Sequence, residues 1–440
     1  ALYRFRKTGR PAVLHWAYAH HVKLMHGARV VRHAHIRAPT KGHMRAVVGD
    51  TWALRVDLAG ADNLGFLPKK EPAATRTELV QDETAGTIHH FSHHWRAVMF
   101  QASYYFTGKG FQKVGMLCLL AEKFFGRGDS RTENCAAMLE KGFRCLYDRH
   151  AAGDCNGAPP SMYYDEQWGG AVTSAGYDND DCTGKADFGN ACYNDHHYHF
   201  GYFVVSAAIL VKLKPEHRRN TAFVGFINTL IRDTTNPSGQ DGFFPRFRSF
   251  DWFDLHSWSR GLPPSTDGKD QESTSEELNL LWGLRLWGGQ IGNRALEQLG
   301  TTMLAFDAVT IREFFLMESN NPHHAAGFAN NHATGIFFQN KVDYTTWFGS
   351  RREYIHGIQM LPLSPALQLT RTEGFCRQEW EHILSKLPLS LTDKWSSILL
   401  SGSLALTQPI EAFHRLSTMN PSDFDDGLTK AWALYWAATQ

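Results

Sequence analysis

From about residue 90 onward, apolar positions recur at helical spacing in runs separated by loops rich in Gly, Pro, Asn and Asp. The clearest runs are 202–213, 222–231, 278–287 and 295–306, and similar stretches lie at 377–387 and 429–438. Repeated helix pairs on this scale fit either an α-solenoid or a closed α/α toroid. The sequence contains no repeat of fixed period, which counts against a solenoid. We therefore expect a mainly α fold.

The first 85 residues follow a different pattern. Residues 21–39 and 44–60 alternate apolar and polar positions and are rich in β-branched side chains, which predicts short strands. Two prolines, Pro68 and Pro72, and the charges around them predict a connector. This part resembles the end of a β-rich domain whose beginning is missing, so we expect a processed or truncated product without a signal peptide.

Composition excludes several classes of protein. Net charge is +1 and the basic residues are scattered, so there is no electrostatic footprint for nucleic acid or an anionic membrane. The longest apolar run, 200–211, is too short to span a bilayer. Aromatic residues make up 13% of the chain, with 13 Trp, which suits either a large core or a platform for carbohydrate. Seven cysteines leave at least one free thiol, and disulfides within 135–192 are open.

The segment 249–277 concentrates acids and aromatics and ends with Glu272 and Glu276. A spacing of four stacks both carboxylates on one face of a helix. Buried acid pairs are costly and are typical of catalytic sites. A capping box from Ser273 to Glu276 would explain Glu276 but not Glu272. If Asp270 caps the helix instead, both glutamates lie in its first turns, although Asp270 could also be an acid of a surface turn.

Asp195 lies just ahead of a long apolar run. A helix N-cap and a catalytic acid are equally good explanations on this segment alone. The neighbours favour chemistry, because a simple cap does not require so many titratable and aromatic groups. Those neighbours are His196, His197, Tyr198 and His199.

Three further clusters place an acid or histidine beside aromatic residues, and they predict a lined cleft. Their members are Tyr164, Asp165 and Trp168; Asp254, His256 and Trp258; and Asp343 and Trp347. The 23 histidines raise the possibility of a metal site, but HExxH is absent and the spacing at 196–199 is not a known ligand pattern. We expect neither a metal nor a cofactor.

The same segments resemble the signature blocks of glycoside hydrolase family 81, whose members are endo-1,3-β-glucanases. The matching strings are ADFGNACYNDHHYHFGYF, FPRFRSFDWFDLHSWSRGL, DGKDQESTSEELN, KVDYTTWFG and EYIHGIQMLPLSP, in the family's order. The resemblance implies a remnant of an N-terminal β-sandwich domain at 1–45, a small α/β connector at 46–88 and an (α/α)6 catalytic domain at 89–440.

The resemblance also implies roles. Asp195 matches the general acid, Glu272 the proposed general base and Glu276 a second essential glutamate, in an inverting reaction on 1,3-β-glucan. Asp270 stands where Asn is common. Candidate substrate contacts are Tyr164, Asp165, Trp168, His197, His199, Tyr202, Asp254, His256, Trp258, Asp343 and Trp347. We also expect a monomer, and the family resemblance implies that it is secreted or associated with the cell wall.

Three other functions remain open. The same scaffold could bind β-glucan without cleaving it, since aromatic and acidic residues also serve recognition. It could belong to another α/α-toroid enzyme, such as a polysaccharide lyase, although a lyase acting on uronates would want more basic residues in its cleft. It could use its histidines as a metal-dependent hydrolase. The presence of all three acids favours the glucanase.

Overall fold

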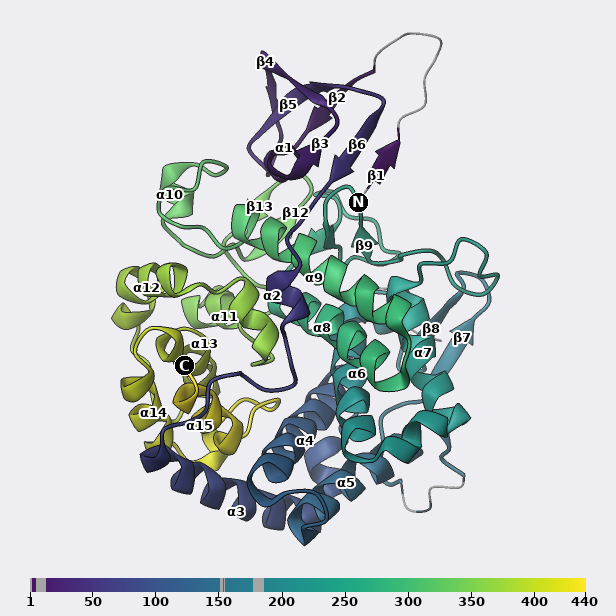
Figure 1. Cartoon of the computed structure of the whole chain (residues 1–440), viewed down its shortest axis with the longest axis vertical. Helices are drawn as coiled ribbons and strands as arrows, with labels where there is room; N and C mark the ends of the chain where they lie inside the picture. Colours follow the sequence, from purple (N-terminus) through teal and green to yellow (C-terminus); the bar gives the residue numbers. More distant parts are fainter. Residues whose placement is uncertain (1, 5–12, 151–152, 154, 177–185) are drawn as a thin grey trace.

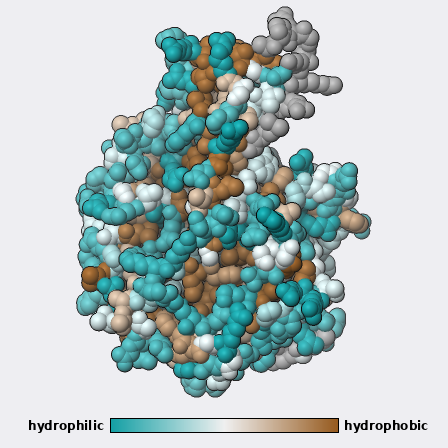
Figure 2. Space-filling view, in the orientation of Figure 1, coloured by the Kyte–Doolittle hydropathy of each residue, from teal (hydrophilic) through white to brown (hydrophobic). Residues whose placement is uncertain are grey.

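The computed structural model describes residues 2–4, 13–150, 153, 155–176 and 186–440 (Figure 1). Beyond residue 74 most of them lie in helices, so the mainly α fold expected from the sequence is confirmed. On the face shown in Figure 2, hydrophilic residues cover most of the helical part, while hydrophobic ones gather in a central band.

The N-terminal part holds two three-stranded antiparallel sheets, with strand orders β1-β6-β3 and β2-β5-β4. Its elements are β1 (Leu2–Arg4), β2 (Leu14–Ala17), α1 (Ala19–Leu24), β3 (Met25–His26), β4 (Arg29–Arg37), β5 (His43–Val48), β6 (Thr51–Leu54) and α2 (Ala59–Asp62). Ala17, Val47 and Trp52 are its buried core. The strands predicted within 21–39 and 44–60 are confirmed, except that residues 21–24 are helical.

The helical part is a ring that closes on itself (Figure 1). The inner members, most of them almost wholly buried, are α4 (Tyr104–Phe125), α6 (His196–Leu213), α8 (Thr274–Ile291), α11 (Arg352–Gly357), α13 (Lys394–Gly402) and α15 (Lys430–Ala438). The outer members, most of them amphipathic, are α3 (Ala74–Met99), α5 (Ser130–Tyr147), α7 (Thr221–Thr235), α9 (Arg294–Phe314), α12 (Glu373–His382) and α14 (Pro409–Thr418). The last helix, α15, packs against α3 and α4, so the fold is a toroid and not an open solenoid.

Helices α6 and α8 form the closest pair in the ring, and glycine permits it. A side chain at Gly201 would lie 3.0 Å from the backbone nitrogen of Leu280, and one at Gly283 would lie 3.1 Å from Val204 and Val205. Residue numbers rise together along the contact, so the two helices run parallel and begin at the same end of the ring. The chain segments that precede both helices therefore meet there.

Short strands and turns join the long helices. The strands are β7 (Met162–Asp165), β8 (Gly170–Thr173), β9 (Phe250–Asp251), β10 (His256–Ser257), β11 (Asp270–Gln271), β12 (Ile336–Phe338) and β13 (Val342–Asp343). The short helices are η1 (Asp187–Cys192), η2 (Pro215–Arg219), α10 (Ala326–Ala329), η3 (Pro365–Leu369), η4 (Leu384–Lys386), η5 (Leu404–Leu406) and η6 (Pro421–Asp423). Among the strands, β11 pairs with β12, which comes much later in the chain. This pairing holds in place the residues just before α8.

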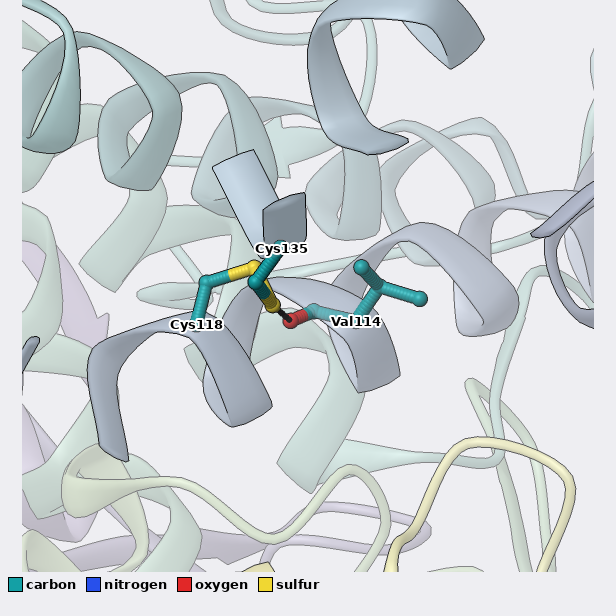
Figure 3. Close-up of a disulfide and its surroundings, with 3 residues drawn as sticks. All are labelled: Val114, Cys118 and Cys135. Carbon is teal, nitrogen blue, oxygen red and sulfur yellow. Dashed lines mark hydrogen bonds between the residues drawn. A yellow bond between two sulfur atoms is a disulfide. The ribbon is translucent and has the colours of Figure 1, made fainter. Parts of the chain in front are cut away.

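Disulfides tie the first helices together. Cys118 of α4 is bonded to Cys135 of α5, and Cys135 Sγ lies 3.8 Å from the carbonyl of Val114 (Figure 3). Cys145 is bonded to Cys155. Cross-links over loops of this size stabilise a fold by about 3 kcal/mol each. Cys192 is also disulfide-bonded, Cys376 is a buried free thiol, and Cys182 lies outside the described residues.

Tryptophan serves both of the purposes that composition left open. Trp282, Trp287, Trp432 and Trp436 are at most 2% exposed and fill the core of the ring. Two others are more than half exposed, Trp168 at 52% and Trp347 at 59%. This exposed pair can offer a ring face to a ligand.

Candidate functional site

Asp195 occupies the N-cap position of α6 with a left-handed φ of 61°. Its side chain makes no capping hydrogen bond within the described part of the chain, so the cap explanation fails. The backbone holds the residue instead: its N–H donates to the Ser259 carbonyl at 2.9 Å, and its carbonyl accepts from the His199 amide at 3.0 Å. A left-handed conformation costs a non-glycine residue about 1–2 kcal/mol and persists only where surrounding contacts impose it.

The histidines after Asp195 are buried supports. His196, His197 and His199 are each 1% exposed. His196 Nδ1 lies 2.5 Å from Asp233 Oδ2, and His197 Nε2 lies 3.1 Å from Gln271 Oε1. Burial lowers the pKa of His197 to about 3 and of His199 to about 4, so both are neutral at pH 7. At this depth they position the start of α6, and contact of His197 or His199 with substrate stays a prediction.

Glu272 and Glu276 do not stack on one helix face. Ser273 caps α8, with its Oγ accepting from the Glu276 amide at 3.4 Å, so Glu272 precedes the helix. The alternative in which Asp270 caps the helix is excluded, because Asp270 lies in strand β11. In a capping box the Glu276 carboxylate would accept from the Ser273 amide. Here the Ser273 amide donates to Tyr198 Oη at 3.0 Å instead, so Glu276 does not cap the helix.

The two glutamates differ in how tightly they are held. Glu276 is 1% exposed and its Oε1 accepts from Tyr202 Oη at 2.7 Å, which places the predicted substrate contact Tyr202 behind the carboxylate. Glu272 is half-buried, and its Oε1 accepts from the backbone N–H of Trp347 at 2.9 Å. Glu272 is therefore the more exposed residue of the two.

Mutual effects on pKa show that the acids converge. Desolvation raises the pKa of Asp195 well above its usual range, and the charges of Asp270, Glu272 and Glu276 raise it further. Burial also raises the pKa of Glu272 to about 8, with smaller contributions from Glu276 and Asp270. Like charges act this strongly only at close range. The structure thus brings Asp195 of one stretch together with three carboxyl groups of a distant one.

Asp270 and Ser259 belong to this site and were not among the predicted catalytic residues. Asp270 is 4% exposed, which overturns its reading as a surface turn acid. Ser259 bridges the acids, because its carbonyl accepts from the Asp195 amide while its own amide donates to the Asp270 carbonyl at 2.7 Å and its Oγ approaches Asp270 Oδ2 at 3.2 Å. The pairing of β11 with β12 buries Asp270, and no local pattern signals it.

Trp347 connects the acids to the surface. Its backbone N–H donates to Glu272, and its Nε1 donates to Asp270 Oδ2 at 3.2 Å, while its ring remains exposed. A groove of about 540 Å³ adjoins it, lined among others by Arg260, Asp267 and Asp343. Asp343 is half-buried and pairs with Lys341 at 2.9 Å.

A second exposed group lies on the β7–β8 hairpin. Tyr164 is 41% exposed and its Oη donates to the Phe243 carbonyl at 2.5 Å. Asp165 accepts from Tyr193 Oη at 2.8 Å, and Trp168 follows in the turn. Tyr164 and Trp168 are exposed on this hairpin, while the lined cleft that the sequence pattern predicted, and contact of these residues with substrate, stay predictions.

Asp254, His256 and Trp258 are engaged elsewhere. Lys41 of the N-terminal part is 2% exposed, and its Nζ lies 2.7 Å from Asp254 Oδ1 and 5.1 Å from the ring centre of Trp258. His256 is fully buried beside the Trp258 ring. This cluster joins the β-rich part to the helical ring, and a role in binding substrate stays a prediction for its members.

Larger metal-ligand clusters and membrane-spanning helices are not seen in the described ranges. Across the ranges that the structure describes, no three His, Cys, Asp or Glu side chains gather as metal ligands. Over the same ranges, no helix is long and apolar enough to cross a membrane.

Comparison with known proteins gives consistent matches over nearly all of the chain. The model of the glycosyl hydrolase family 81 C-terminal domain matches residues 78–434, and that of the N-terminal domain matches residues 3–71. A glucan endo-1,3-beta-D-glucosidase of Arthroderma benhamiae is 34% identical over 449 residues, covering 99% of this chain and 48% of that protein. A primary septum glucan endo-1,3-beta-D-glucosidase of Schizosaccharomyces pombe is 36% identical over 338 residues, covering 76% and 32%.

A solved structure agrees with the fold. A glycoside hydrolase family 81 protein of Clostridium thermocellum superimposes with a TM-score of 0.80 at 21% identity, covering 98% of this chain and 56% of that one. The chain spans about half the length of the A. benhamiae relative. With the family model matched over most of its length and both acidic segments in place, the chain belongs to glycosyl hydrolase family 81.

Proposed function

We propose that this chain hydrolyses internal 1,3-β-D-glucosidic bonds of 1,3-β-glucans by an inverting mechanism. The observation that carries the proposal is that the segments bearing Asp195 and the two glutamates meet at the shared end of α6 and α8, where Tyr198 Oη accepts from the amides of Glu272 and Ser273 at 3.0 Å. The relatives' names support the linkage, since the A. benhamiae and S. pombe proteins are both called glucan endo-1,3-beta-D-glucosidases.

Asp195 is the general acid. Hydrolysis requires a group that is still protonated at working pH and can protonate the leaving glycosidic oxygen. Burial and three neighbouring carboxyl groups raise the pKa of Asp195, which keeps its proton in place. As the C–O bond breaks, its electron pair goes to the oxygen, which takes that proton.

Glu272 is the general base in its ionised form, whose fraction grows as pH rises toward its pKa of about 8. That carboxylate would accept a proton from a water molecule whose oxygen attacks the anomeric carbon from the opposite face, giving an α product. Glu272 is favoured over Glu276 because it is the more exposed residue of the two, whereas Glu276 is 1% exposed and bonded to Tyr202. Glu276 would hold Asp195 protonated through its charge. Asp270 would add to the same effect.

The substrate is a neutral polymer, and the exposed rings of Trp168 and Trp347 suit its sugar faces. We propose that the chain acts as a monomer, outside the cell or in its wall. The disulfides support this location, because such bonds persist in oxidising compartments. We also propose the domain division at residues 45 and 88 that the family resemblance implies.

The test is hydrolysis of laminarin by the full chain of 440 residues. Reducing ends and the first-formed anomer, followed by NMR, should show internal cleavage and an α product. The matched control is Asp195→Asn, which should lower kcat about 100- to 10,000-fold while glucan binding is preserved. Binding without any release of reducing ends by the wild type would indicate a glucan-binding protein, and a β product would exclude the inverting roles.

A further inference from the structure

Four histidines lie on the surface of α3, outside the carboxylate site. His89, His90, His93 and His94 are all exposed. Residues four apart on a helix are neighbours on one face, so His89 faces His93 and His90 faces His94. None of these residues takes part in the chemistry proposed above.

The spacing of the His89 and His93 rings matches a chelate. Their ring centres lie 4.8 Å apart with the planes inclined at 64°. An ion bound ~2.0–2.1 Å from one nitrogen of each imidazole, with an angle of about 90–110° at the metal, places the ring centres about 4.5–5.2 Å apart. The two rings can therefore reach one ion without a change in backbone.

The protonation pattern of His93 also fits a ligand. Its Nδ1 lies 2.8 Å from the carbonyl oxygen of His89, which can only accept a hydrogen bond. Nδ1 must then carry the proton, so neutral His93 has its lone pair on Nε2. Metal-binding histidines typically hold their second nitrogen in this way, donating it to a carbonyl or carboxylate, which fixes the tautomer and the ring orientation.

The second pair has a similar ring spacing, but it differs from the first in backbone geometry and in hydrogen bonding. His90 and His94 have ring centres 5.1 Å apart, but His94 departs from helical geometry with φ −127° and ψ 24°. Among the described residues, no backbone carbonyl is bonded to either of these two rings. This pair therefore serves as the natural comparison for the first.

We propose that His89 and His93 chelate a late first-row divalent metal ion, Zn²⁺ or Cu²⁺, on the surface of α3. Imidazole suits both ions, and Cu²⁺ binds more tightly than Zn²⁺ in the usual order of affinities. In the described part of the chain no third ligand joins the pair, so water completes the coordination. An ion bound to the folded helix but more weakly to the unfolded chain stabilises the fold.

The test is calorimetric titration of the full chain with ZnCl₂ and, separately, CuCl₂ in buffer free of chelators. The double variant His89→Gln/His93→Gln should weaken the tightest binding step at least tenfold. The matched variant His90→Gln/His94→Gln should change it less than threefold, and His414→Gln, which removes a lone exposed histidine of α14, should leave it unchanged. Electron paramagnetic resonance of the Cu²⁺ form should show coupling to two nitrogens in the wild type.

Two outcomes would overturn the proposal. One is wild-type affinity in the His89→Gln/His93→Gln variant, and the other is an equal loss in the His90→Gln/His94→Gln variant. Because all four side chains are exposed, circular dichroism should show the same melting for every variant without metal. Single substitutions of His89 and His93 provide a second measurement, each expected to weaken binding on its own.

Discussion

The floor of the carboxylate site and its rim are built in opposite ways. The floor, Asp195 with Glu276, sits at the start of two tightly packed parallel helices, and Glu276 is 1% exposed. The rim, Trp168 and Trp347, stands on a hairpin and a loop with more than half of each side chain exposed. Burial raises the pKa of the carboxyl groups in the floor, and burying these groups lowers the stability of the fold. Exposure gives the rim apolar area that a sugar ring can cover.

The floor and the rim are in contact through Trp347, which distinguishes Trp347 from Trp168. Through its backbone N–H and its Nε1, Trp347 is bonded to Glu272 and Asp270. Trp168 is linked to the scaffold differently: its carbonyl accepts from Arg248 at 3.2 Å. A change at Trp347 therefore reaches the acids, whereas a change of the Trp168 side chain should affect the surface alone.

The largest effect is expected at the floor, where the two glutamates can be told apart. Glu272→Ala and Glu276→Ala should each lower laminarin turnover about 100- to 10,000-fold. Azide should restore turnover only in Glu272→Ala, because a small anion can take the place of the activated water and attack the anomeric carbon to give an α-glucosyl azide. Product analysis by NMR measures this. Rescue confined to Glu276→Ala would exchange the two roles.

Replacing Glu272, which should lower activity, should raise the stability of the fold. The pKa of Glu272 is raised in the fold to about 8, so the native state holds a proton that the unfolded chain releases near its ordinary value of 4.5. Ionisation of Glu272 therefore costs the wild type stability as pH rises across that window. Glu272→Gln removes the cost, and its advantage in urea unfolding, about 1–2 kcal/mol, should be larger at pH 8 than at pH 5. A constant difference at both pH values would contradict the shift.

The family resemblance named Asp195, Glu272 and Glu276 as the acids, and their catalytic roles stay predictions, but the sequence did not show how these side chains are held. The apolar runs 202–213 and 278–287 were sufficient to locate α6 and α8, because a helix that is buried on all sides is apolar along nearly its whole length. The helix-face argument for Glu272 failed, since Ser273 begins the helix and the strand before it is fixed by β12. Pairing between distant segments has no local pattern, so the burial of Asp270 could not be predicted.

Histidine-rich segments show the same limit. The doublet His196–His197 and the doublet His89–His90 look alike in the sequence, yet the first is buried in hydrogen bonds and the second lies on the surface. What separates them is the helix that carries them: α6 is an inner helix, enclosed by α4 and α8, whereas α3 is an outer one. Whether a helix lies inside or outside the ring depends on the tertiary structure, so the local sequence did not predict which doublet would be buried.

Changes at the rim should have intermediate effects and should divide according to the contacts of each tryptophan. Trp168→Ala should raise KM several-fold with little change in kcat, because it removes stacking area worth about 1 kcal/mol and leaves the acids in place. Trp347→Ala should lower kcat as well, since the Nε1 bond to Asp270 is lost with the ring. Steady-state kinetics on laminarin measures both, and Trp347→Phe separates stacking from the hydrogen bond. Equal effects of the two alanine variants on kcat would remove the distinction between the tryptophans.

The smallest effect is expected from Asp270→Asn, which keeps the size of the side chain and an oxygen that can accept from Trp347 and Ser259. While ionised, Asp270 raises the pKa of Asp195. Removing that charge lowers the Asp195 pKa, so the general acid loses its proton at lower pH and the alkaline limb of the kcat profile moves toward neutrality. Activity at the optimum should change less than about tenfold, because no group that transfers a proton is lost. If the alkaline limb of the kcat profile does not move, Asp270 supports the structure around the acids but does not set the pKa of Asp195.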